Sequence, residues 1–205
     1  MQRSSYIEDI SPRLHIYPSR EADQLKQEVL TNHDRRALEA IGRLLLEELD
    51  LTSVVPVLVL RGGLMLWEPC REPAGTRPTG IIVPKRDQHE QSPSIAYASL
   101  PCVPQAHYLL LDVLIASGRT MDTCLSEIYQ RFPDNRIDVA APFVSSYGRN
   151  YLLSRFPSSH IHCIWHAEQI DRQGWMVGPG FDIGDYTLGW TGNYAVWSAE
   201  GTAHA

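Results

Sequence analysis

The segment from residue 107 to residue 132 constrains the fold more than any other part of the chain. It opens with HYLLLDV, an apolar run that predicts a buried strand, and LIASGRT follows at once as a tight turn. The next stretch, MDTCLSEIYQRF, carries apolar residues at helical spacing, namely Met121, Leu125, Ile128 and Phe132. A strand, a turn and a helix in direct succession are the building unit of a parallel α/β sheet.

The same alternation recurs on both sides of this segment. The runs VVPVLVLRGG (54–63) and GIIVP (80–84) predict two strands before it, the first of them buried on both faces. After it, DVAAPFVSS (138–146) and HIHCIWHA (160–167) predict two more strands, with YGRNYLLSRF between them as a helix. We therefore expect a central parallel sheet covered by helices on both faces.

A helix is also predicted over NHDRRALEAIGRLLLEEL, where Leu38, Ile41 and Leu45 share a face, and either Asn32 or Asp34 can cap it. Sequence repeats and low-complexity linkers are absent from the 205 residues. We accordingly expect one domain over residues 1–205.

The charge balance limits the kinds of partner. A formal net charge of −6 argues against binding of nucleic acid or of an anionic membrane, and any anion site must be local. The sequence has no apolar run of signal-peptide or membrane-spanning type, so we expect a cytoplasmic protein.

The turn after the predicted strand 107–112 is a candidate phosphate site. Ligands of open parallel sheets bind beyond the carboxyl ends of the strands, where Asp112 lies. The turn Ala116-Ser117-Gly118-Arg119-Thr120 leads into a helix, whose first N–H groups and dipole favour an anion. The alternative is an ordinary strand-to-helix connection with a solvated arginine.

Two further segments carry chemistry. Arg61-Gly62-Gly63 ends a buried strand, and a glycine pair there can let the backbone approach a ligand, while an arginine beside it can hold a pyrophosphate oxygen. The segment 174–190, GWMVGPGFDIGDYTLGW, is rich in glycine and aromatic residues, which suggests packing over a planar ligand. The alternatives are a plain strand-ending turn and a loop that folds Trp175 and Trp190 onto the core.

These segments, in this order, resemble those of the type I phosphoribosyltransferases, and specifically those of the uracil phosphoribosyltransferase family. VPVLVLRGGL is similar to the family's VPILRAGL, DVLIASGRT to its DPMLATGGS loop, and the segment 174–185 to its GYIxPGxGDxGD segment. Arg86 and Pro93 stand where the family has a mobile loop that begins with arginine and closes with proline, and the family's AAP recurs at 140–142. The resemblance covers most of the chain from about residue 34.

The resemblance implies a fold, a reaction and a site. The fold is a type I phosphoribosyltransferase-like α/β domain with a small C-terminal hood over the acceptor site. The reaction is the Mg²⁺-dependent transfer of a phosphoribosyl group from phosphoribosyl pyrophosphate to uracil, giving uridine monophosphate and pyrophosphate in pyrimidine salvage. The Mg²⁺ ion would bind with the pyrophosphate of the donor rather than in a metal site of the protein. The family likeness also suggests a homo-oligomer, a dimer or larger.

The implied residue roles divide by substrate. Catalysis would rest on Asp112, Arg61 and Arg86. The donor would be bound by Arg61, Gly62, Arg86, Asp112, Ala116, Ser117, Gly118, Arg119, Thr120 and Asp182. The planar acceptor would be bound by Trp175, Met176, Phe181, Asp182 and Ile183. The loop from Lys85 to Pro93 would close over the ligands and keep water from the donor.

The chain departs from the family pattern at positions that matter. Arg119 replaces a glycine of the phosphate loop, which either adds a phosphate contact or obstructs the turn. GPGFD stands in place of PGxGD, so Pro179 is shifted and Phe181 replaces a glycine. An alternative function is therefore phosphoribosyl transfer to another heterocyclic or aromatic acceptor in a specialised pathway. A non-catalytic nucleotide-sensing or RNA-binding regulator is a third hypothesis, against which the acidic charge counts.

A histidine pair needs a separate interpretation. His160 and His162 are expected on the same strand face, where a metal site is conceivable. Without a carboxylate or cysteine at motif spacing, hydrogen-bonded or solvated imidazoles are favoured.

Overall fold

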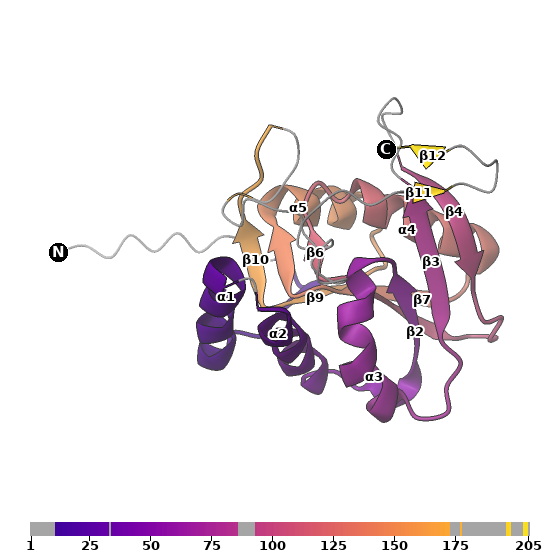
Figure 1. Cartoon of the computed structure of the whole chain (residues 1–205). Coiled ribbons are helices and arrows are strands. Elements are labelled where there is room, and N and C mark those ends of the chain that lie inside the picture. Colours follow the sequence, from indigo (N-terminus) through magenta and orange to yellow (C-terminus); the bar gives the residue numbers. More distant parts are fainter. Residues whose placement is uncertain are drawn as a thin grey trace.

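A computed structural model describes residues 11–32, 34–85, 93–172, 177, 196–197 and 203–204. Its main feature is a seven-stranded sheet with the order β1-β9-β7-β5-β2-β3-β4 (Figure 1). These strands are β1 (Leu14–Ile16), β2 (Val54–Val59), β3 (Gly80–Lys85), β4 (Ser94–Ser99), β5 (His107–Leu111), β7 (Arg136–Ala140) and β9 (Ile161–Cys163). All neighbouring pairs are parallel except β3 with β4.

A smaller parallel sheet with the order β10-β8-β6 accompanies the main sheet, and a short antiparallel pair lies near the C-terminus. These strands are β6 (Leu114–Ile115), β8 (Phe143–Ser145), β10 (Trp165–Glu168), β11 (Val196–Trp197) and β12 (Ala203–His204). The helices are α1 (Arg20–Asn32), α2 (Arg35–Glu47), α3 (Trp67–Ala74), α4 (Arg119–Arg131) and α5 (Ser146–Arg155), with 3₁₀ turns η1 (Leu51–Ser53) and η2 (Gly62–Leu66).

Helices cover both faces of the main sheet, with α1, α2 and α3 on one face and α4 and α5 on the other (Figure 1). Alternate residues of β5 serve the two layers: Leu109 and Leu111 pack in the core beneath α2, whereas Tyr108 and Leu110 pack in the core beneath α4. Every residue of β2 is buried. The predicted α/β architecture is therefore confirmed. It forms because strands such as β2 are apolar on both faces, so that helices must cover both sides of the sheet.

The helix predicted near residue 34 is confirmed as α2, and Asp34 is its cap. The Asp34 carboxylate accepts hydrogen bonds from the backbone N–H groups of Arg36 and Ala37, at 2.8 and 3.4 Å. Asn32, the other candidate cap, instead ends α1.

The sequence interpretation missed or merged several elements. It did not predict β1, α1, α3 or β4, and β4 is an antiparallel edge strand with mostly exposed residues, which gives little apolar signal. It also merged β7 with β8, although Pro142 separates them. Ala141 N–H still bonds to His162 of the main sheet at 3.0 Å, but proline has no N–H, and Phe143 N–H bonds to Val113 at 3.2 Å. The chain thereby passes from the main sheet to the small one.

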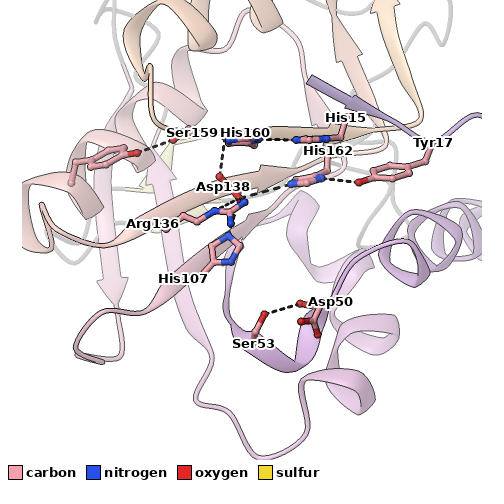
Figure 2. Close-up of polar contacts among 11 residues, drawn as sticks. His15, Tyr17, Asp50, Ser53, His107, Arg136, Asp138, Ser159, His160 and His162 are labelled. Atoms are coloured by element: carbon pink, nitrogen blue, oxygen red, sulfur yellow. Dashed lines mark hydrogen bonds and ion pairs between the residues drawn. The ribbon is translucent and has the colours of Figure 1, made fainter. Parts of the chain in front are cut away.

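A buried carboxylate organises the histidines at the β1 side of the main sheet (Figure 2). The Asp138 carboxylate is fully buried and lies 2.8 Å from His107 Nε2, while it accepts hydrogen bonds from Arg136 Nε and from the backbone N–H of His160, each at 2.9 Å. Burial alone would raise the pKa of Asp138, but hydrogen bonds from His107, His162, the His160 N–H and Arg136 outweigh it and hold the pKa well below its usual range.

The imidazoles beside Asp138 bond to and stack on one another. His15 Nε2 and His160 Nδ1 are 2.7 Å apart, and the ring of His15 stacks on that of His162 with centroids 4.7 Å apart (Figure 2). The favoured interpretation of His160 and His162 as hydrogen-bonded imidazoles is confirmed. Among the described residues, no three His, Cys, Asp or Glu side chains gather to hold a metal ion.

The stacked imidazoles predict a pH dependence of stability. Burial, followed by the charge of the neighbouring imidazoles, lowers the pKa of His15, and burial also lowers that of His160. The folded chain therefore binds fewer protons than the unfolded chain, so stability that is present above about pH 6.5 is lost as the pH falls. We expect the melting temperature to decrease between about pH 7.5 and about pH 5.5, as measured by circular dichroism. The variant His15→Gln should flatten this dependence, and an equal slope in both proteins would contradict the explanation.

Candidate functional site

The candidate site lies where two neighbouring parallel strands end. β2 and β5 pair in register through Leu58 and Leu111, so their carboxyl ends meet at the same edge of the sheet. Arg61 and η2 follow β2, and Asp112 follows β5. The peptide bond between Leu60 and Arg61 is cis.

The glycine pair after β2 brings these two chain segments into contact. A Cβ atom on Gly62 would lie 2.1 Å from Oδ1 of Asp112 and 2.9 Å from Cγ2 of Val113. A Cβ atom on Gly63 would lie 2.5 Å from the carbonyl oxygen of Leu111. Both glycines are therefore required for the close approach of these two chain segments to each other. The sequence had suggested a different reason for the glycine pair, namely the close approach of a ligand.

Two hydrogen bonds to backbone groups hold Asp112 in place. Its N–H donates to the carbonyl of Ala140 at 3.2 Å, and its Oδ1 accepts from the N–H of Val113 at 2.7 Å. The half-buried carboxylate is thus fixed at the end of β5, next to Gly62.

The predicted phosphate turn leads into a helix, although not directly from the main sheet. Strand β6 intervenes and pairs with β8, and residues 116–118 then connect β6 to α4. Gly118 has φ +79° and precedes the helix without a side-chain cap, and Asp122 N–H bonds to its carbonyl at 2.8 Å as the first helical hydrogen bond. The N–H groups of the first helical turn have no partner inside a helix, and they carry its positive dipole end. This geometry can bind a phosphate.

Arg119 does not obstruct this turn. The left-handed conformation belongs to Gly118, where glycine adopts it without steric cost, and Arg119 is the first helical residue with an exposed side chain. The replacement of a glycine at position 119 is therefore compatible with the loop.

The start of helix α5 packs against the turn through Ser145 and Gly148, a contact that the sequence did not predict. Ser145 Oγ accepts from the N–H of Gly148 at 2.8 Å and donates to the carbonyl of Ala116 at 2.5 Å. A Cβ atom on Gly148 would lie 2.4 Å from that same carbonyl. The Ser145 cap and the absence of a side chain at Gly148 let α5 pack against this turn, and the serine-to-glycine spacing was the available sequence signal.

The structure brings together part of the predicted site. The residues that it places after β2 and β5, in the turn before α4 and at the first two positions of α4 are Arg61, Gly62, Asp112, Ala116, Ser117, Gly118, Arg119 and Thr120. Six predicted site residues lie outside the described part of the chain, namely Arg86, Trp175, Met176, Phe181, Asp182 and Ile183.

Comparisons with known proteins identify the family of the chain. The sequence profile of the family described as "Uracil phosphoribosyltransferase" matches residues 26–188. The chain belongs to the uracil phosphoribosyltransferase family. A uracil phosphoribosyltransferase of Sulfolobus acidocaldarius is 27% identical over 150 residues, which cover 68% of each protein. The chain is accordingly a phosphoribosyltransferase, an enzyme that transfers a pentosyl group.

Solved structures support the fold of this phosphoribosyltransferase. The protein AQ2163 of Aquifex aeolicus superposes with a TM-score of 0.74 at 18% identity, over 87% of this chain and 99% of that one. An adenine phosphoribosyl transferase of Trypanosoma brucei gives a TM-score of 0.54 at 10% identity, over 94% and 96% of the two chains. The predicted type I phosphoribosyltransferase fold is confirmed. None of the helices described in this phosphoribosyltransferase is long and apolar enough to span a bilayer.

The contact between Gly62 and Asp112 predicts the effect of a single methyl group. The variant Gly62→Ala should displace the Asp112 carboxylate and lower the rate of phosphoribosyl transfer about 100-fold, since small misplacements of reacting groups are costly. Steady-state rates would be compared with those of Gly80→Ala at the start of β3, whose Cβ would meet the side chains of Val57 and Leu100 at 3.1 and 3.2 Å. Full activity of Gly62→Ala would show that the two loops do not depend on this contact.

Proposed function

We propose that the chain transfers the 5-phosphoribosyl group from phosphoribosyl pyrophosphate to uracil, giving uridine monophosphate and pyrophosphate. The observation that carries the proposal is the contact between Gly62 and Asp112, because it places the Asp112 carboxylate beside the segment that follows Arg61, at the carboxyl ends of β2 and β5. Membership of the uracil phosphoribosyltransferase family supports the reaction class.

In the proposed complex, the 5′-phosphate lies against residues 116–120 at the start of α4. Backbone N–H groups and the hydroxyl groups of Ser117 and Thr120 supply donors, and the exposed Arg119 side chain adds positive charge nearby. Asp112 lies four residues before this turn, and its carboxylate would accept hydrogen bonds from the ribose hydroxyl groups. Arg61, in the adjacent loop, would bind the pyrophosphate.

The reaction needs no covalent intermediate on the protein. Displacement of pyrophosphate from the anomeric carbon develops positive charge on the sugar, which the Asp112 carboxylate stabilises, and negative charge on the leaving group, which Arg61 stabilises. Arg86, outside the described residues, would add a second cation to the pyrophosphate. Holding donor and acceptor in contact supplies the remainder of the rate enhancement.

The described residues fit a Mg²⁺ ion that arrives with the donor. Mg²⁺ keeps several waters and commonly binds through substrate phosphates together with one or two carboxylates. Asp112 is a carboxylate at the site and would supply one such ligand. The ion would neutralise charge on the pyrophosphate as it leaves.

The proposed acceptor is uracil. Uracil would be bound by Trp175, Met176, Phe181, Asp182 and Ile183, which lie outside the described residues. Because Phe181 stands where the family pattern has glycine, a different planar heterocycle is the second candidate acceptor.

Release of pyrophosphate tests the proposed reaction. Purified protein with phosphoribosyl pyrophosphate, Mg²⁺ and uracil should release pyrophosphate and form uridine monophosphate, both measurable by coupled assay and chromatography. Release with another heterocycle and none with uracil would replace uracil by that acceptor, and no release with any acceptor would contradict the proposed reaction.

Asp112 can be tested by a nearly isosteric change. Asp112→Asn keeps an oxygen for the Val113 N–H but removes the charge beside the ribose, so we expect turnover to fall about 100-fold with little change in melting temperature. Asp134→Asn, at an exposed position after α4, is the matched control. Equal turnover in the two variants would mean that Asp112 does not contact the sugar.

The acceptor pocket can be tested at Phe181. Replacement of Phe181 by Gly restores the family residue, and we expect the ratio of kcat/KM for uracil over larger heterocycles to shift at least about tenfold. An unchanged ratio would show that Phe181 does not determine acceptor choice.

A further inference from the structure

A second carboxylate lies two residues beyond the phosphate turn 116–120. Asp122 is in the first turn of α4, its N–H bonds to the carbonyl of Gly118 at 2.8 Å, and its side chain is only 14% exposed. A carboxylate at this place is favourable for the helix dipole. Its negative charge is nevertheless unfavourable for a phosphate bound at the same helix end, because like charges repel in a poorly solvated site.

Two side chains of α5 hold this carboxylate. Tyr151 Oη donates to Asp122 Oδ2 at 2.5 Å, and Arg155 Nε donates to Asp122 Oδ1 at 3.0 Å. Ser126, one turn along α4, adds a longer hydrogen bond to Oδ1 at 3.3 Å. The hydrogen bond from Tyr151 to the carboxylate raises the pKa of the tyrosine, so it remains a donor at neutral pH.

Tyr151 also contacts the phosphate turn itself. A Cβ atom on Gly118 would lie 3.1 Å from Cδ1 of the Tyr151 ring, which therefore packs against the left-handed glycine. One side chain thus touches the turn with its ring and the Asp122 carboxylate with its hydroxyl group. The Tyr151 side chain therefore connects the Asp122 carboxylate to the backbone of the phosphate turn.

We propose that Tyr151 and Arg155 are positioning residues for the phosphate turn: they engage the Asp122 carboxylate so that its charge does not oppose the bound phosphate. The inference rests on the phosphate site of the proposed function, and not on the identity of the acceptor. Asp122 would serve to fasten α5 against the start of α4, and its two partners would reduce its repulsion of the bound phosphate.

The test is a double-mutant cycle read out by ligand binding. Tyr151→Phe keeps the ring and leaves the Asp122 charge only partly compensated, so we expect the Kd for ribose 5-phosphate, measured by calorimetry, to rise about five- to tenfold. Adding Asp122→Asn to Tyr151→Phe should restore the wild-type Kd, since the uncompensated charge is then gone. Phosphoribosyl pyrophosphate should show the same pattern as a change in KM with kcat nearly constant.

A matched control is a tyrosine further along α4. Tyr129 of α4 bonds to Ser159 Oγ at 2.9 Å, so Tyr129→Phe also deletes one tyrosine hydrogen bond but lies far along α4 from the phosphate turn. Its Kd should equal that of the wild type. Where Tyr151→Phe lowers the melting temperature too far for binding measurements, Arg155→Gln, at a side chain that is 53% exposed, takes its place in the cycle.

The outcomes separate this inference from the proposed function. An unchanged Kd in the single variant, or a weakened Kd that Asp122→Asn does not restore, would overturn the positioning role in favour of simple packing. Wild-type protein that does not bind ribose 5-phosphate would overturn both proposals. Wild-type protein that binds ribose 5-phosphate but releases no pyrophosphate with any acceptor would overturn the proposed reaction alone.

Discussion

The absence of a side chain at Gly62 is the constraint on which the site depends. The segments after β2 and β5 can meet only because Gly62 leaves room for the Asp112 carboxylate and Gly63 leaves room for the Leu111 carbonyl. The parallel pairing of β2 with β5 brings the two strand ends to one edge, and the hydrogen bond from Asp112 N–H to Ala140 ties β7 to the same edge. The arginine and the carboxylate therefore lie directly after two packed strands, and the turn before α4 follows β6.

Charge in this protein is arranged locally. The chain carries a formal net charge of −6, and in the proposed complex the phosphate would meet the positive dipole end of α4 and the exposed Arg119 side chain. Carboxylates occur close to that site, but each is fixed by donors: Asp112 by the Val113 N–H, and Asp122 by Tyr151 and Arg155. The buried Asp138 carboxylate, which lies outside the site, is likewise held by donors, namely His107 and Arg136.

Sequence reasoning predicted the features that depend on local pattern. The two-sided apolar run at β2, the helical face of α4 and the turn at Gly118 were all anticipated, because periodicity and glycine placement encode them. It missed features that depend on the partner of a residue. The role of Gly62 is defined by Asp112, fifty residues away, and Pro142 divides one apolar run between two sheets. Tyr151 looked like an ordinary helix residue, since its link to Asp122 exists only after α5 packs on α4.

The central claim, that the two loops and the start of α4 together hold an activated ribose donor, can be examined directly by a crystal structure of the protein with phosphoribosyl pyrophosphate and Mg²⁺. We predict that the 5′-phosphate lies against the backbone of residues 116–120, with the ribose hydroxyl groups beside Asp112 and the pyrophosphate beside Arg61. A donor bound elsewhere, or a phosphate that makes no contact with the first turn of α4, would contradict the account.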